Sequence, residues 1–203
     1  MSRAAVADVL VDGPALESRV DALADELSHD YAGRSLLLVG ILKGSTPFLA
    51  DLIRRMPIDV SVDFMSISSY GGTGVQSGIV RIMKDLDTDI GGRDVLVVED
   101  IVDTGLTLAY LRRTLMERGP QTVRTVTLLD KTARRIIPVP VEYKGFEIED
   151  VFVVGYGLDW QGRYRNLPDL LVVADVARLA SDPSALEDRL VAGRRRRGVS
   201  FGS

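Results

Sequence analysis

Residues 95–107 limit most strongly what this chain can fold into, because they read as a buried strand, an acidic loop and a helix start. The run 95–98 is entirely apolar, Glu99 and Asp100 follow it, and Asp103 lies in the turn beyond. A continuous apolar run is typical of a parallel strand buried on both faces. Leucines then recur at helical spacing, at Leu108, Leu111 and Leu115. The stretch therefore predicts an α/β fold whose ligands bind beyond the carboxyl ends of parallel strands.

The loop within this stretch carries groups that suit a sugar phosphate. Thr104, Gly105 and Thr107 offer hydroxyls and unhindered backbone N–H groups at a helix N-terminus, where a phosphate is favoured. Glu99 and Asp100 are acceptors for hydroxyl groups or a divalent cation. Together they describe a ribose 5-phosphate site, although an acidic turn with N-capping residues would give the same pattern. Neither GxxxxGK nor GxGxxG occurs, so the common nucleotide-binding loops are excluded.

Length and composition indicate one globular α/β domain. The chain has 203 residues, 46% hydrophobic and 27% charged, and its net charge of −4 gives no general reason to expect nucleic-acid binding. It has no cysteine, which excludes disulfides and thiol chemistry. No apolar run is long enough to span a membrane, and residues 1–10 lack a secretory pattern, so we expect a cytoplasmic protein. The one histidine, His29, has no ligand partners near it in sequence and is expected to be solvated.

A second strand–turn–helix unit also suits an anion. We expect a strand over 35–41, a turn over 42–45 that presents Lys43, and a helix with Thr46 as its cap and Pro47 at its first position. A plain turn with a solvated lysine is the simpler interpretation of the same residues.

The remaining pattern alternates strands and helices. Further strands are expected over residues 9–11, 58–67, 78–83, 123–129 and 170–174, and helices over 16–31, 106–118 and 183–191. The glycine- and serine-rich segment 68–77 connects two of these strands, and 141–160 is a compact β-rich segment. Lys131 follows a strand at the same sheet edge as the acidic loop. Arginines at 194–197 form a basic run that we expect to be a solvated tail.

At this point the residues resemble a known family. The sequence of residues 99–107, EDIVDTGLT, is similar to the phosphoribosyl-diphosphate motif of the type I phosphoribosyltransferases, and Asp103 within it points to the 6-oxopurine branch, the hypoxanthine-guanine enzymes. Five motifs fall in family order over residues 8–176. The resemblance implies one domain over 1–203, with a mostly parallel sheet flanked by helices and a small hood. The hood would come from the N-terminal segment and residues 141–176, and residues 192–203 would be a flexible tail.

The resemblance implies a purine salvage transferase. Such an enzyme uses Mg²⁺ to transfer phosphoribose from 5-phosphoribosyl 1-diphosphate to hypoxanthine or guanine, giving IMP or GMP and pyrophosphate. Family members are usually homodimers or homotetramers. Leu106 and Val151 stand where the better-known eukaryotic members have lysine, which affects the expected strength of phosphate contact and the purine preference.

The family's roles for phosphate and metal carry over residue by residue. Glu99 and Asp100 would hold the ribose hydroxyls, directly or through Mg²⁺, and residues 103–107 would cradle the 5-phosphate. The pyrophosphate group would be bound by Leu42, Lys43, Gly44 and Arg165, often with a cis peptide between Leu42 and Lys43. Asp159 would help to place a second Mg²⁺ through water.

The family's roles for the base carry over in the same way. Asp103 would act as general base on purine N7, and Lys131 would bind O6. Phe152 would stack on the purine, and backbone groups near Val153 and Asp159 would meet the 2-amino group of guanine. In the segment 68–77, the pair Ser69 and Tyr70 would cover the reacting centre as part of a lid.

Two other classes of protein remain open on the sequence. A regulatory protein could use this fold to sense phosphoribosyl diphosphate, but it would not need Asp103, Lys131 and Asp159 together. Another α/β nucleotide enzyme, such as a methyltransferase, would need a glycine-rich loop after its first strand and would leave residues 103–107 unexplained.

Overall fold

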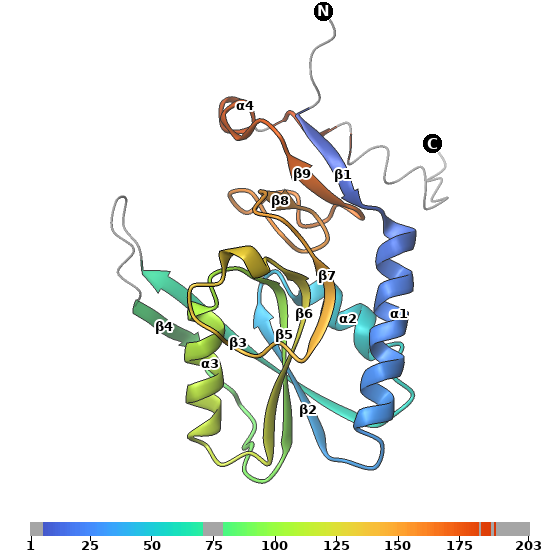
Figure 1. Cartoon of the computed structure of the whole chain (residues 1–203), viewed down its shortest axis with the longest axis vertical. Helices are drawn as coiled ribbons and strands as arrows, with labels where there is room; N and C mark the ends of the chain where they lie inside the picture. The colour runs from blue at the N-terminus through green and yellow to red at the C-terminus, as the bar shows by residue number, and fades with distance from the viewer. Residues whose placement is uncertain (1–5, 71–78, 183, 188, 190–203) are drawn as a thin grey trace, which may run out of the picture. The chain divides into compact units, whose positions relative to one another are not determined.

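Five parallel strands and one antiparallel edge strand form the larger sheet in the computed structural model, which describes residues 6–70, 79–182, 184–187 and 189. The strand order is β4-β3-β2-β5-β6-β7 (Figure 1). The strands are β2 Leu36–Leu42, β3 Val60–Tyr70, β4 Ile79–Lys84, β5 Asp94–Val102, β6 Thr122–Asp130 and β7 Tyr143–Glu147. Only β4 runs antiparallel to its neighbour, which confirms the prediction of a mostly parallel α/β sheet.

The chain divides into two compact units. The larger covers Arg19–Asp150 and contains this sheet, and the smaller combines Met1–Ser18 with Val151–Ser203. Helix α1, Gly13–Asp30, begins in the smaller unit and continues into the larger one. The expected hood segment began at about 141, but residues 141–150 belong to the larger unit, because β7 pairs with β6.

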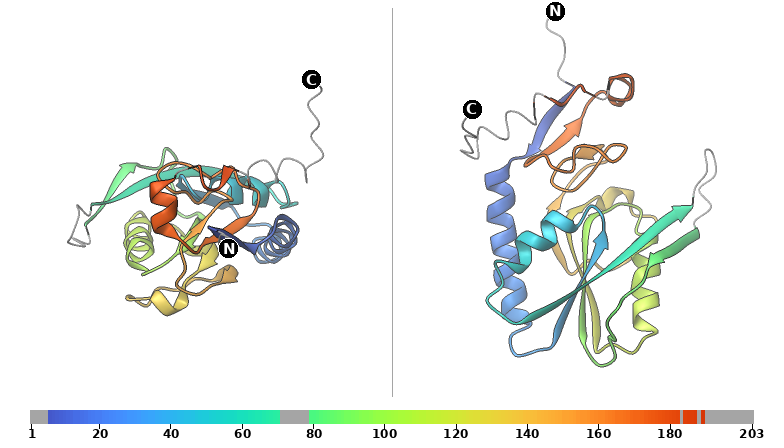
Figure 2. Two further views of the ribbon diagram at one scale, coloured as in Figure 1. Left: turned by 90° about the horizontal axis from the view of Figure 1, so that it is seen from above. Right: turned by 180° about the vertical axis from the view of Figure 1, so that it is seen from behind.

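Helices cover the two faces of the larger sheet (Figure 2). On one face, helix α3, Leu106–Met116, places its buried leucines in a cluster with Val39 and Val97. The opposite face of β2 carries Gly40, and a Cβ there would lie 2.7 Å from Cδ2 of Leu49 on helix α2, Thr46–Ile53. Since successive strand residues alternate between faces, β2 is buried on both sides, as its continuous apolar sequence predicts.

The start of α2 differs from the expectation, and Thr46 as its cap is wrong. Ser45 is the N-cap, so Thr46 and Pro47 occupy the first two helical positions. Neither hydroxyl caps the helix: Ser45 Oγ donates to the carbonyl of Ile41 at 2.7 Å and Thr46 Oγ1 to that of Lys43 at 2.8 Å. Both hydroxyls therefore hold the preceding turn instead of the helix N–H groups.

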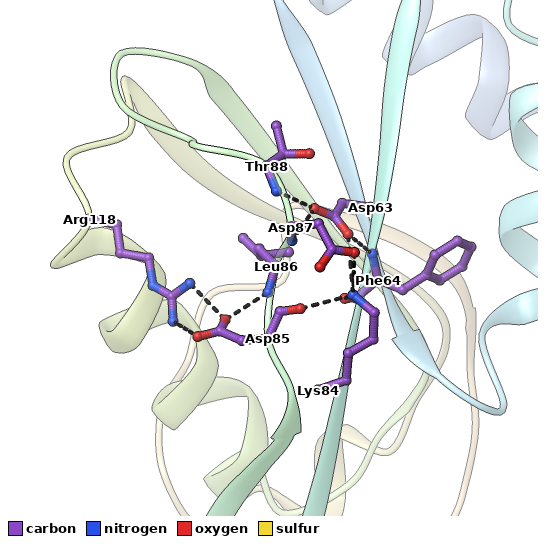
Figure 3. Close-up of polar contacts among 8 residues, drawn as sticks. All are labelled: Asp63, Phe64, Lys84, Asp85, Leu86, Asp87, Thr88 and Arg118. Atoms are coloured by element: carbon purple, nitrogen blue, oxygen red, sulfur yellow. Dashed lines mark hydrogen bonds and ion pairs between the residues drawn. The ribbon is translucent and has the colours of Figure 1, made fainter.

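The β3–β4 pair is pinned by Asp63, which is only 5% exposed (Figure 3). Its carboxylate accepts the backbone N–H groups of Phe64, Asp87 and Thr88 at 2.7–2.9 Å. Lys84 Nζ donates to the carbonyl of Phe64 at 3.1 Å. These bonds hold the residues after β4 against β3. The two strands lead into and out of the segment 68–77 expected to be a lid, of which residues 71–77 lie outside the described part of the chain.

The smaller unit is built on a three-stranded antiparallel sheet of order β1-β9-β8. Its strands are β1 Ala7–Val11, β8 Val153–Val154 and β9 Leu170–Val173, and helix α4 covers Val176–Ser181. The β-rich segment 141–160 is thus divided between two sheets, β7 in one and β8 in the other. α4 was not expected, and residues 183, 188, 190 and 191 of the helix expected over 183–191 lie outside the described residues. None of the described helices is long and apolar enough to cross a membrane.

Candidate active site

A hollow of about 220 Å³ lies at the carboxyl end of β5. It is lined by the acidic pair, by the loop that follows it and by the start of α3, namely Ile67, Glu99, Asp100, Ile101, Val102, Asp103, Thr104, Gly105, Thr107 and Leu108. The structure therefore gathers the loop residues that the sequence assigned to a ribose 5-phosphate around one open space, at the sheet edge where ligands of such folds bind.

Gly105 sets the shape of the loop. It is the N-cap of α3 with φ +84°, in the left-handed region that favours glycine. A Cβ at this position would lie 2.8 Å from Arg135 Cδ and 2.8 Å from the carbonyl oxygen of Ile137. The carbonyl of Thr104 accepts the N–H of Ile136 at 2.9 Å. The segment after β6 therefore packs against this loop and restrains it. The start of α3 also lines the hollow. Backbone N–H groups in the first turn of a helix have no acceptor within the helix, so they remain available to a ligand.

The acidic pair at the hollow combines a buried and a partly exposed carboxylate. Glu99 is only 6% exposed, and burial raises its pKa well above the usual range, with a further contribution from the charge of Asp100. Asp100 Oδ1 accepts the N–H of Ile101 at 2.9 Å. Adjacent carboxylates that repel each other suit Mg²⁺, which takes oxygen ligands and is held in proteins by one or two of them. Within the described ranges, no three His, Cys, Asp or Glu side chains form a metal site on their own.

The turn after β2 lies directly against Asp100. A Cβ on Gly44 would lie 1.5 Å from Asp100 Oδ2, so only glycine allows the backbone and the carboxylate to come so close. The peptide bond between Leu42 and Lys43 is cis, an arrangement that the resemblance suggested and the sequence could not decide. The two turns that the sequence singled out independently are therefore neighbours at one edge of the sheet.

Asp103 belongs to a ring of alternating charges. Arg134 Nε donates to Asp103 Oδ1 at 3.1 Å, and Arg134 Nη1 donates to Asp150 Oδ2 at 2.9 Å. Lys131 Nζ closes the ring, 3.5 Å from Asp150 Oδ1 and 3.8 Å from Asp103 Oδ2. The sequence predicted sites at Asp103 and Lys131 but not the other two members. Arg134 could have been found from its spacing, since the 3₁₀ turn Thr132–Arg134 brings residues three apart onto one side.

In the smaller unit, the predicted base-stacking residue is accessible. Phe152 is 36% exposed and meets the ring of Trp160 edge to face, with centroids 5.3 Å apart. Edge-to-face packing is one of the favoured arrangements of two aromatic rings. Val153, which follows it, is the buried first residue of β8.

Asp159 and Arg165, assigned separately to the pyrophosphate region, form a pair. Arg165 Nη2 lies 2.6 Å from Asp159 Oδ1, and Arg165 Nη1 donates to the carbonyl of Gly157 at 2.7 Å. Asp159 Oδ2 accepts the N–H of Gly162 at 2.6 Å. Ser69 and Tyr70 are the last two residues of β3, and residues 71–77 of the expected lid lie outside the described residues.

Comparison with known proteins shows that the chain matches a protein family. The model of the phosphoribosyl transferase domain matches residues 6–161. The hypoxanthine-guanine phosphoribosyltransferase of Bacillus subtilis (strain 168) is 47% identical over 160 residues, covering 79% of this chain and 89% of that protein. The enzyme of the same name from Mycobacterium tuberculosis (strain H37Rv) is 45% identical over 168 residues, covering 80% and 83%.

Two further similarities concern a longer protein and a solved structure. The bifunctional protein TilS/HprT of Listeria monocytogenes serotype 4b is 49% identical over 160 residues, but the chain spans only 25% of its length. A hypoxanthine phosphoribosyltransferase from Staphylococcus aureus has a similar crystal structure, with a TM-score of 0.80 at 42% identity, covering 84% of this chain and 92% of that one.

Proposed function

Since the chain belongs to the phosphoribosyl transferase domain family, we propose that it transfers phosphoribose from 5-phosphoribosyl 1-diphosphate to hypoxanthine or guanine, releasing pyrophosphate. The products are IMP and GMP. The observation that carries the proposal is the hollow at the end of β5, which combines the acidic pair, Asp103 and the glycine-shaped loop at the start of α3. Relatives with 45–47% identity that bear the name hypoxanthine-guanine phosphoribosyltransferase support the choice of substrates.

The hollow is the place for the sugar and its 5-phosphate. The phosphate would accept hydrogen bonds from backbone N–H groups of the 103–107 loop and from the hydroxyls of Thr104 and Thr107, aided by the positive end of α3. Glu99 and Asp100 would accept hydrogen bonds from the ribose hydroxyls or bind them through Mg²⁺. The lining of the hollow by the 103–107 loop, and the close approach of Gly44 to Asp100 beside it, support these assignments.

The pyrophosphate group would be bound by the turn Leu42–Lys43–Gly44 and by Arg165. Glu99 and Asp100 would hold Mg²⁺, with Asp159 holding a second ion through water. When bound, Mg²⁺ supplies positive charge that neutralises the departing pyrophosphate. The ammonium of Lys43 and the backbone N–H groups of its turn would add fixed charge and dipoles at the same group.

The purine would be recognised through its 6-oxo group and its face. Lys131 would donate to O6, Phe152 would stack on the ring, and backbone groups near Val153 and Asp159 would meet the 2-amino group of guanine. The bond from ribose C1 to pyrophosphate breaks while the bond from purine N9 to C1 forms, and Asp103 takes the proton from N7. The bond from C1 to pyrophosphate breaks ahead of formation of the bond from N9 to C1, so the sugar becomes oxocarbenium-like. Water must then be kept away from it.

A purine panel tests the proposal. Purified protein with phosphoribosyl diphosphate and Mg²⁺ should convert hypoxanthine and guanine and leave adenine unchanged, because Lys131 is a donor matched to a 6-oxo group and mismatched to a 6-amino group. A site built to hydrogen-bond one group rejects its opposite by large factors. Turnover of adenine at a rate comparable to that of hypoxanthine would refute the assignment.

The same proposal includes a cytoplasmic enzyme that works as a homodimer or homotetramer. The family resemblance supports both parts of this proposal. Light scattering of the purified protein would measure the mass of the assembly. A monomer of the 22.2 kDa chain at working concentrations would contradict it.

A further inference from the structure

We propose that Arg134 and Asp150 are positioning residues that fix the carboxylate of Asp103 for the chemical step. The inference rests on the proposed function, in which Asp103 takes the purine N7 proton. It concerns two residues that neither the sequence motifs nor the family's pattern singles out.

The two oxygens of Asp103 have different surroundings. Oδ1 accepts a hydrogen bond from Arg134 Nε at 3.1 Å. Oδ2 lies 3.8 Å from Lys131 Nζ, a separation longer than a hydrogen bond. A carboxylate held through Oδ1 keeps one rotamer and presents Oδ2 beside the lysine proposed to bind O6. N7 and O6 lie on the same edge of a purine, so this arrangement offers the acceptor and the donor side by side.

Arg134 is in turn oriented by a second carboxylate. Its Nη1 donates to Asp150 Oδ2 at 2.9 Å, so one planar guanidinium joins two carboxylates through two different nitrogens. This two-point attachment fixes the plane of the guanidinium and hence the direction of Nε toward Asp103. A single hydrogen bond would leave it free to rotate.

The backbone brings these groups together but does not by itself hold the side chain of Asp103. Val102 at the end of β5 pairs with Asp130 at the end of β6, so Asp103 and Lys131 follow neighbouring strands in register. Lys131 N donates to the carbonyl of Val102 at 2.9 Å, and Arg134 N to that of Lys131 at 2.9 Å. The side chain of Asp103 is still 39% exposed, and Arg134 is its restraint in the ring.

Exposure decides between a stabilising and a positioning role. The side chains of Asp103, Arg134 and Asp150 are 39%, 42% and 53% exposed, and ion pairs between such groups contribute little to folding stability. Loss of the Arg134 contacts should therefore change the melting temperature little and the reaction rate more.

The test compares single-turnover rates with hypoxanthine and phosphoribosyl diphosphate in Arg134→Met and Asp150→Asn. Each should lower the rate about tenfold, the lower end for loss of a residue that orients a reacting group. The dissociation constant for phosphoribosyl diphosphate should change less than about twofold, since the loop's backbone groups remain. Arg134→Lys should not restore the rate, because an ammonium keeps the charge without the two-point planar hold.

An exposed pair elsewhere provides the control. Arg118 donates to the carboxylate of Asp85 through two nitrogens, at 2.7 and 3.0 Å (Figure 3). Arg118 follows the C-terminal end of α3, whereas the 103–107 loop precedes its N-terminal end. Arg118→Met and Asp85→Asn should have the single-turnover rate of the unmodified protein.

Combination with Asp103→Asn shows whether Arg134 acts through Asp103. If it does, Arg134→Met causes no further loss in the Asp103→Asn background. An unchanged rate in Arg134→Met, full recovery in Arg134→Lys, or an equal additional loss on top of Asp103→Asn would overturn the positioning role alone. An undiminished rate in Asp103→Asn itself would overturn the base assignment, and the positioning role with it.

Discussion

The close approach of Gly44 to Asp100 makes a sharp test of the site. Alanine at Gly44 would place its Cβ 1.5 Å from Asp100 Oδ2 and 2.5 Å from Asp100 Cγ, distances far too short for atoms that are not bonded to each other. Gly44 is not among the glycines with positive φ, so alanine adds no backbone strain of its own. The substitution therefore acts by forcing Asp100 or the turn to move.

The expected cost to folding is small. The movement that relieves the overlap with least change elsewhere is rotation of Asp100, which breaks its 2.9 Å hydrogen bond from the N–H of Ile101. Loss of one such bond costs about 1 kcal/mol, which lowers the melting temperature of a chain this size by about 2–4 °C. Asp100 remains partly exposed, so water can solvate its new position.

The expected cost to activity is much larger. A rotated Asp100 no longer presents its carboxylate to Mg²⁺ or the ribose, and the altered turn disturbs pyrophosphate binding, so kcat/KM should fall by about 100-fold or more. Gly91→Ala is the control, because the nearest atom to a Cβ there lies 3.5 Å away, an ordinary contact. It should retain full activity.

Melting curves and initial rates with hypoxanthine measure the two effects. A Gly44→Ala protein with unchanged kcat/KM would refute the reasoning, since Asp100 would then have moved without consequence. A fall in melting temperature above about 10 °C would also refute it, because the structure would have yielded in the core and not at Asp100.

The remaining predictions concern the base, the phosphate and pH. Asp103→Asn should slow the single-turnover step by about 100-fold with little change in phosphoribosyl diphosphate binding. Thr107→Val should mainly weaken that binding, by about tenfold. The reverse pattern would contradict Asp103 as the base and Thr107 as the phosphate-binding residue. Burial raises the pKa of Asp63, but hydrogen bonds from the Phe64, Thr88 and Asp87 N–H groups outweigh it and lower the pKa below 3.8. The stability from Asp63 is therefore complete above about pH 4 and is lost as pH falls further. Asp63→Asn should flatten acid denaturation curves, and an unchanged curve would contradict this.

Much of the fold could be predicted from local patterns. The apolar run at 95–98 is buried on both faces of the sheet, and the leucines of α3 pack where their helical spacing placed them. The family identified from residues 99–107 is confirmed by the domain match over residues 6–161. These features depend on neighbours in sequence, because strand and helix periods and strand–turn–helix motifs are local.

Other features depend on which strands lie side by side. β7 joins the larger sheet and β8 the smaller one, although the sequence reads as one β-rich segment, because a strand's pattern does not specify its partner. The hydroxyls of Ser45 and Thr46 likewise bind the turn before α2, a choice that its geometry decides.

The sequence by itself therefore determined the fold class, the family and the candidates Glu99, Asp100, Asp103 and Lys131, since each lies near or just after the carboxyl end of a recognisable strand. Only the tertiary structure decided what these residues touch: Gly44 lies against Asp100, and Arg134, which also binds Asp150, donates to Asp103. Such contacts arise from strand order and register, which bring together turns distant in sequence. The packing of the whole chain sets that order, and no local pattern records it.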